Sequence, residues 1–149
     1  MKKLLLLFLL LTSCAKRTYH IDPELMPIVQ IFLNEGMKRG LYYSVNEIDI
    51  VYDTLKSPKV GVCEKSIDGM NKLYRKIKVD RTYWMYNQVM REQLMTHELG
   101  HCILNRPHIS TYKYGLPVSV MNPYVLDEWE FRVNRTYYYN ELFGRYINE

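Results

Sequence analysis

Two histidines and a glutamate stand close together in the segment His97-Glu98-Leu99-Gly100-His101. Residues four apart on a helix share one face, so the imidazoles of His97 and His101 are expected one turn apart, where both can bind one metal ion. Glu98 projects about a quarter-turn away, near that ion but not bound to it. The alternative is a pair of helix histidines beside a capping carboxylate. The pattern predicts a metal site at the end of a helix.

His108 is the best candidate for a third ligand, which a catalytic zinc site needs in addition to an open position. Three of the four histidines of the chain lie within residues 97–108. Asn105 tolerates the left-handed conformation that ends helices, and Pro107 prevents the helix from continuing. We therefore expect the chain to turn back after His101 and to bring His108 to the ion. The alternative for His108 is an ordinary histidine in a surface loop.

The segment also resembles the metzincin zinc peptidases, whose motif HExxHxxGxxH is followed by a methionine turn. Residues 119–123, Ser-Val-Met-Asn-Pro, are similar to that turn. The resemblance implies that the Met121 thioether lies beneath the zinc histidines, while plain core packing of Met121 is the alternative.

The chain departs from the family's pattern after the second histidine. Leu104 and Pro107 occupy the positions of the family's glycine and third histidine, and His108 follows one residue later. We interpret this as one inserted residue, with Asn105 in place of the glycine.

The resemblance implies peptide-bond hydrolysis by a zinc metallopeptidase. Zinc activates a water molecule, and Glu98 acts as the general base that takes its proton and passes it to the leaving amine. Tyr124, three residues after Met121, is a candidate for oxyanion support, with core or rim packing as its alternative. The rival third ligands are Glu128 and Glu130, at the start of the last helix, as in the thermolysin-like group.

The elements around these residues predict an α+β domain. The N-terminal helix is expected at about 24–38, with Asp22 as its N-cap and Pro23 as a proline in its first turn. The remaining elements are expected as strands at 46–53, 59–65 and 73–79, a helix at 87–104, a loop at 105–123 and a helix at 126–143. The resemblance implies a small metzincin-like domain, with a short mixed sheet, a central zinc-binding helix, the methionine turn and a C-terminal helix.

Residues 73–79 are predicted to form an exposed edge strand, because lysines gather on one of its faces. This strand would be the upper rim of the cleft, where an extended peptide can add by main-chain hydrogen bonds. The segment before the methionine turn has two possible roles. It forms either the wall of a side-chain pocket or an exposed aromatic loop, and its residues are Tyr112, Tyr114, Leu116 and Pro117.

The first residues are typical of a bacterial lipoprotein signal. A basic start precedes the apolar run Leu4–Leu11, and Leu11-Thr12-Ser13-Cys14 resembles a lipobox. We expect residues 1–13 to be the signal peptide, Cys14 to carry the lipid, 14–21 to be a lipidated tether and 22–149 a single domain. The alternative is an ordinary secretory signal with a chance cysteine. A lipid anchor places the protein in the cell envelope. An aspartate directly after the lipid cysteine can retain a lipoprotein in the inner membrane. Position 15 is an alanine instead, which weakly favours the outer membrane.

Charge and cysteine content limit the possible partners. Removal of Lys2 and Lys3 with the signal lowers the formal net charge from +4 to +2. No cluster of basic residues indicates nucleic-acid binding. The expected partners are therefore a peptide or protein substrate and the membrane, and the protein is expected to be a monomer. Cys63 and Cys102 are either a disulfide or two buried thiols.

Two other functions fit the same residues. One is a non-catalytic metal-binding or structural lipoprotein on a peptidase-like scaffold. The other is a zinc amidase that acts on cell-wall peptides. Glu98 favours an enzyme, because a site that only binds metal needs no base there.

Overall fold

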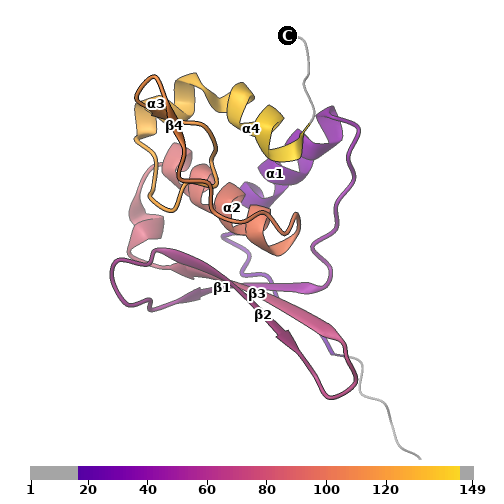
Figure 1. Ribbon diagram of the computed structural model, residues 1–149. Helices are drawn as coiled ribbons and strands as arrows, with labels where there is room; N and C mark the ends of the chain where they lie inside the picture. Colours follow the sequence, from indigo (N-terminus) through magenta and orange to yellow (C-terminus); the bar gives the residue numbers. More distant parts are fainter. Residues whose placement is uncertain (1–16, 145–149) are drawn as a thin grey trace, which may run out of the picture.

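The computed structural model describes residues 17–144, so the signal peptide and the predicted lipidation site at Cys14 lie outside the described residues. The fold is a small α+β domain, as predicted (Figure 1). Its elements, in chain order, are α1 Met26–Lys38, β1 Ile48–Asp53, β2 Gly61–Ile67, β3 Leu73–Asp80, η1 Tyr83–Met85, α2 Gln88–Cys102, β4 Tyr112–Lys113, β5 Leu116–Pro117, α3 Glu128–Val133 and α4 Arg135–Phe143.

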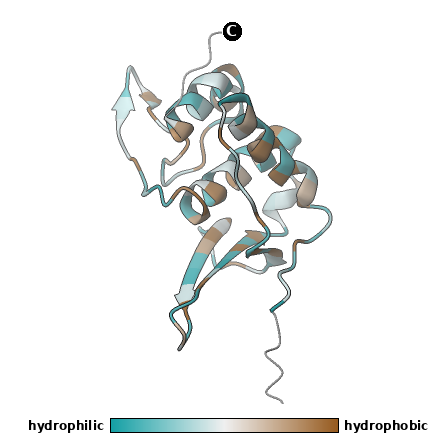
Figure 2. Cartoon of the chain, turned by 90° about the vertical axis from the view of Figure 1, so that its right-hand side faces the viewer, coloured by the Kyte–Doolittle hydropathy of each residue, from teal (hydrophilic) through white to brown (hydrophobic). Residues whose placement is uncertain are grey.

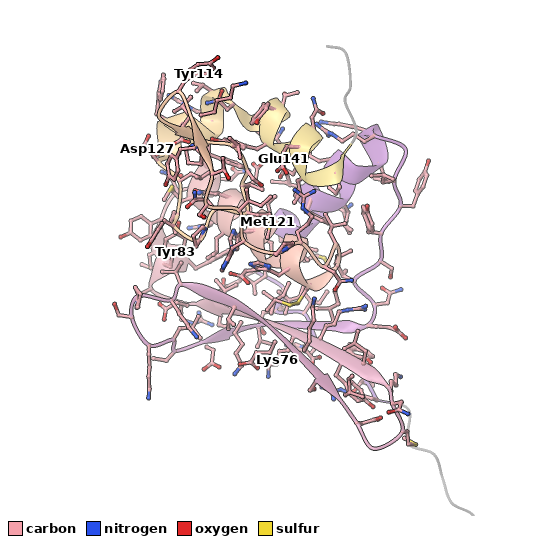
Figure 3. The ribbon with its side chains drawn as sticks, viewed as in Figure 1. Lys76, Tyr83, Tyr114, Met121, Asp127 and Glu141 are labelled. Atoms are coloured by element: carbon pink, nitrogen blue, oxygen red, sulfur yellow. A yellow bond between two sulfur atoms is a disulfide. The ribbon has the colours of Figure 1, made fainter. Side chains whose placement is uncertain are left out.

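The main sheet has the order β1-β3-β2, in which β1 is parallel and β2 antiparallel to β3. The prediction that residues 73–79 form an edge strand is therefore wrong, because β3 is central. The lysines of β3 lie on the face of the sheet that no helix covers, and Figure 3 shows Lys76 on that side. There, Lys78 forms ion pairs with Asp53 and Glu64. Alternating lysines thus mark an open sheet face here, and the edge strands are β1 and β2.

Helix α1 begins at Met26, later than predicted, with Pro27 in its first turn. Asp22 does not cap this helix. Its backbone N–H donates to the carbonyl of Ile50, and its carboxylate accepts from the N–H of Tyr52 at 2.8 Å. Asp22 therefore fastens the incoming chain to the outer edge of β1.

The predicted tether contacts the domain over its described residues. Arg17 forms an ion pair with Asp49 of β1 at 2.8 Å, and Ile21 forms a parallel bridge with Ile50. Residues 17–21 thus lie against the sheet instead of forming a free linker. No helix within residues 17–144 combines the length and apolar character needed to span a membrane.

Helix α2 lies between the sheet and the other helices (Figure 1). Its side chains at Leu94, Met95 and Leu99 are buried, and its N-cap Asn87 accepts from the N–H of Met90 at 3.1 Å. Helices and strands carry apolar and polar residues in turn along their length (Figure 2). The apolar faces meet around α2, so the helix that carries His97 and His101 is held in the core by its other side chains.

The C-terminal part contains two features that the sequence analysis did not predict. The predicted loop 105–123 includes the β4–β5 hairpin, which turns at Tyr114 and Gly115, both with positive φ. The predicted helix 126–143 is two helices, α3 and α4, divided at Asn134.

Candidate metal centre

Three histidine side chains converge at the end of α2. His97 Nε2 lies 3.0 Å from His101 Nε2 and 3.2 Å from His108 Nε2. All three ligand atoms lie within 4.8 Å of one another. The predicted return of the chain occurs as expected, since Asn105 adopts a left-handed conformation with φ 53°. The three histidines therefore form one group that could hold a metal ion.

Backbone carbonyls orient two of these rings. The Nδ1–H of His97 donates to the carbonyl of Val120 at 2.9 Å, and the Nδ1–H of His101 donates to that of Arg106 at 2.7 Å. Because a carbonyl only accepts, Nδ1 is the protonated nitrogen of each neutral ring, and Nε2 presents its lone pair. Burial lowers the pKa of His97 to about 4 and also lowers the pKa of His101, which keeps both rings neutral at pH 7.

Two lone pairs that face each other at 3.0 Å repel, because neither nitrogen has a proton to share. A cation between them turns this repulsion into attraction. Fixing Nδ1 by a backbone acceptor is also how metal-binding histidines are generally oriented. The chemistry of the donor set therefore fits a bound metal ion.

Glu98 lies in the wall between α2 and β2. Its carboxylate accepts from the backbone N–H of Cys63, while Oε2 is buried and has no hydrogen-bond partner. Burial raises the pKa of Glu98 to about 8. A carboxyl group with this pKa binds a proton more tightly than an ordinary one, so in its deprotonated form the free oxygen beside the histidines is suited to accept a proton from a water molecule.

Met121 packs under the helix turn that carries the histidines. It is fully buried, and a Cβ on Gly100 would lie 2.5 Å from Met121 Sδ (Figure 3). The absence of a side chain at Gly100 thus leaves room for the thioether. Met121 is also fixed by its backbone, since its carbonyl accepts from the N–H of Ile109, one residue after His108.

Helix α4 supports the two carbonyls that orient the histidines. Glu141 binds the Arg106 guanidinium and accepts from the Ser119 hydroxyl at 2.5 Å. Arg106 itself supplies the carbonyl for His101, and Ser119 precedes Val120, which supplies the carbonyl for His97. One carboxylate therefore ties both supporting loops to α4 (Figure 3).

A cavity of about 600 Å³ opens in front of the histidines. One rim of the cavity is formed by β2 and by the residues that precede it from Pro58. The prediction that residues 73–79 form this rim is wrong. The other lining residues of the cavity come from α2, from His108 and from residues 122–125. The predicted pocket wall at 112–117 does not line this cavity, because it forms the β4–β5 hairpin, whose Tyr114 is 92% exposed. The alternative, an exposed aromatic loop, is correct.

The remaining predicted site residues take different places. Tyr124 lines the rim of the cavity and is 75% exposed. The rival ligands do not reach the histidines: Glu128 accepts from the side chain of Asn87, and Glu130 accepts from the hydroxyl of Tyr138. His108 is thus the residue that joins His97 and His101.

A disulfide links Cys63 of β2 to Cys102 at the end of α2, which decides between the two alternatives for these cysteines. Cys102 follows His101 directly, and the backbone of Cys63 contacts Glu98. The rim of the cavity is therefore covalently joined to the helix that carries the histidines and the glutamate.

Sequence reasoning did not predict that residues of β2 line the cavity. Gly61 faces Glu98, and a Cβ at this position would lie 2.6 Å from Glu98 Oε1. A glycine within a strand is the signal that could have indicated this close approach. Lys65, on the same face, lines the cavity and donates to the side chain of Asn105 at 2.6 Å. No comparable signal in the sequence places Lys65 there.

Comparisons with protein-family models, with curated proteins and with solved structures found no match.

Proposed function

We propose that the protein is a zinc-dependent peptidase with a metzincin-like arrangement of its site. The observation that carries this proposal is the convergence of three imidazole Nε2 atoms beside the free oxygen of a buried glutamate. Zn–N bonds of about 2.0–2.1 Å in a tetrahedron place ligand nitrogens about 3.3 Å apart. The distances of 3.0 and 3.2 Å from His97 Nε2 are close to this value.

Zinc held by His97, His101 and His108 would activate a water molecule and polarise the scissile carbonyl. The protein's own part in the reaction falls mainly to Glu98. Its free Oε2 accepts the proton of the attacking water, and the carboxyl group then delivers this proton to the leaving amine. The N–H of Cys63 holds the carboxylate in place during both steps.

Strand β2 offers the surface on which an extended peptide would lie. It pairs with β3 on one edge, and within residues 17–144 no other strand pairs with its second edge. Residues 61–63 and Lys65 of this strand line the cavity. A peptide added there by main-chain hydrogen bonds would pass between β2 and residues 122–125. Tyr124, on this opposite rim, would support the oxyanion.

We also propose that the protein is anchored in the cell envelope by a lipid on Cys14, with the outer membrane favoured. Cys14→Ser should leave the precursor unprocessed and remove the lipid. Phase separation in detergent measures this, and unchanged partitioning would contradict the assignment.

The peptidase is tested with Glu98→Gln. Glutamine keeps an oxygen that can accept from Cys63 but cannot take the water's proton, so zinc content should stay near one per chain. Hydrolysis of an unfolded protein should fall by about 10²–10⁴-fold. His97→Ala should lose both metal and activity. Equal hydrolysis by wild type and Glu98→Gln would refute the mechanism, and a zinc-loaded wild type that cleaves neither proteins nor cell-wall peptides would favour the non-catalytic scaffold.

The third ligand is tested separately. His108→Ala should weaken zinc binding strongly, because two histidines leave the ion under-coordinated. Glu128→Gln and Glu130→Gln serve as matched controls and should keep wild-type zinc affinity in equilibrium dialysis. The reverse result would reassign the ligand.

A further inference from the structure

The β2–β3 hairpin extends beyond the body of the domain. Strand β1 pairs with β3 from Arg75 to Asp80, whereas the pairing of β2 with β3 continues to Ile67 and Leu73. Residues 66–74 lie beyond the end of this pairing with β1 and form a two-stranded ribbon with no third strand beside it. The ribbon projects at the lower right of Figure 1. We call residues 66–74 the hairpin tip.

The hairpin tip exposes three large apolar side chains. Ile67 is 68% exposed, Met70 81% and Leu73 37%. Ile67 and Leu73 are directly paired across the ribbon, so their side chains lie on the same face. Single exposed apolar residues are common, but three grouped on one projecting turn indicate contact with a non-aqueous partner.

Two basic side chains lie beside the tip at Tyr74, whose side chain points to the opposite face of the ribbon from Ile67 and Leu73. The Arg17 guanidinium lies 4.5 Å from the centroid of the Tyr74 ring, and Lys72 Nζ lies 5.8 Å from the centroid of the same ring. The acid of the tip, Asp68, is directed inward: it accepts from the N–H groups of Met70 and Lys72 and from the hydroxyl of Tyr74. The outer surface of the tip therefore combines apolar residues with the basic side chains of Lys72 and of Arg17, which also pairs with Asp49.

The hairpin tip lies at the end of the molecule where the chain enters from Cys14. Arg17 is three residues from Cys14, and three residues span at most about 11 Å. Since Arg17 rests on Tyr74, a lipid on Cys14 would emerge close to the tip. The anchor and the apolar residues would thus reach the same bilayer together.

We propose that the hairpin tip docks on an anionic phospholipid surface, with Ile67, Met70 and Leu73 at the acyl boundary and Arg17 and Lys72 at the headgroups. This inference rests on the proposed lipidation and is independent of the peptidase function. Stable anchoring generally combines an acyl group with a second, apolar or basic, contact. The tip supplies both kinds of second contact.

Docking would fix the orientation of the cleft. Strand β2 runs from the tip to the cavity, and Cys63 is four residues from Ile67, or about 13 Å at strand spacing. The rim of the cleft would therefore lie near the membrane surface and would favour substrates held close to that surface.

The test uses the full lipidated protein in vesicles of phosphatidylglycerol and brominated phosphatidylcholine, which quenches tryptophan near acyl chains. Met70→Trp places a reporter in the tip. Tyr114→Trp is the matched control, because Tyr114 is 92% exposed on the β4–β5 hairpin at the far end of the molecule (Figure 3). Wild type gives the background of Trp84 and Trp129. Emission from Met70→Trp should be quenched and blue-shifted, while that from Tyr114→Trp should match unbrominated vesicles.

The charge requirement is tested by Lys72→Gln in the Met70→Trp background. Each basic residue near an anionic surface contributes about fivefold to partitioning, so the docked-to-undocked ratio should fall about fivefold. Quenching of Met70→Trp no greater than that of Tyr114→Trp, in protein that sediments with vesicles, would overturn the docking alone. Protein that stays in the supernatant would overturn the lipidation and this inference with it, and neither result affects zinc binding or hydrolysis.

Discussion

The disulfide should supply a large part of the stability of the domain. Its cysteines are 39 residues apart, and closing a loop of this size in the unfolded chain is worth about 4 kcal/mol at 25 °C. Within residues 17–144 it is the one disulfide. Replacing Cys63 and Cys102 together by alanine should therefore lower the free energy of unfolding by about that amount, a large fraction of the 5–15 kcal/mol typical of domains.

The loss should affect hydrolysis more than zinc binding. All three candidate ligands lie outside β2, whereas the rim of the cavity and the N–H that holds Glu98 belong to it. Without the bridge, β2 is held against α2 by packing and by the hydrogen bond from Cys63 to Glu98, with no covalent link. We expect the double variant to keep one zinc per chain and to cleave more slowly.

The assay is urea unfolding at fixed zinc concentration, for oxidised wild type, reduced wild type and the double variant. Reduced wild type is the matched control, because it keeps both sulfur atoms and lacks only the bond. It should unfold close to the double variant and well below the oxidised protein. The reasoning would be refuted if oxidised wild type and the double variant differed by less than the extrapolation uncertainty of the curves.

Three further predictions follow from individual side chains. Gly61→Ala places a Cβ 2.6 Å from Glu98 Oε1, so it should cost about 1–3 kcal/mol in denaturant unfolding and reduce hydrolysis while zinc content stays unchanged; full activity would contradict the close approach. The hydrogen bond from the Thr82 side chain, with those from backbone N–H groups, lowers the pKa of Asp80 from 3.8 to about 2. The stability that this carboxylate adds is thus present above pH 3.8 and lost as the pH falls towards 2, and the gap in unfolding free energy between wild type and Asp80→Asn should close over that range. Lys59 and Lys65 are the two charged residues among the cavity-lining residues from Pro58 to Lys65. Lys65→Glu should therefore shift the preference in a peptide-library digest from acidic towards basic residues. An unchanged cleavage profile would exclude Lys65 from specificity.

Sequence patterns predicted the local structure around the histidines well, because short-range rules determine it. The spacing of His97 and His101 and the left-handed turn at Asn105 depend on helix geometry and on which residues tolerate positive φ. The structure brings His108 to the other two histidines, as the spacing predicted. The identity of the metal and the peptidase activity stay predictions.

Long-range features could not be predicted in the same way. The lysines of β3 alternate equally well on an exposed edge strand and on a central strand with one open face, and only strand order distinguishes the two. The partner of Cys63 and the place of Lys65 in the cleft likewise depend on how β2 lies against α2. The sequence has no proline or glycine near Asn134, so no helix-breaking residue indicated that the last helix divides there.

The contacts of Glu141 make the arrangement of the three histidines depend on the whole domain. This carboxylate belongs to α4, the last described helix, and binds Arg106 and Ser119. It lies 33 residues along the chain from His108, the nearest candidate ligand. The short histidine motif transplanted into another helix would therefore lack the hydrogen bonds that select its tautomers. On the proposed function, metal affinity would report completion of folding at the C-terminal end, because a chain truncated before α4 would lack the support of Glu141 and should bind zinc more weakly.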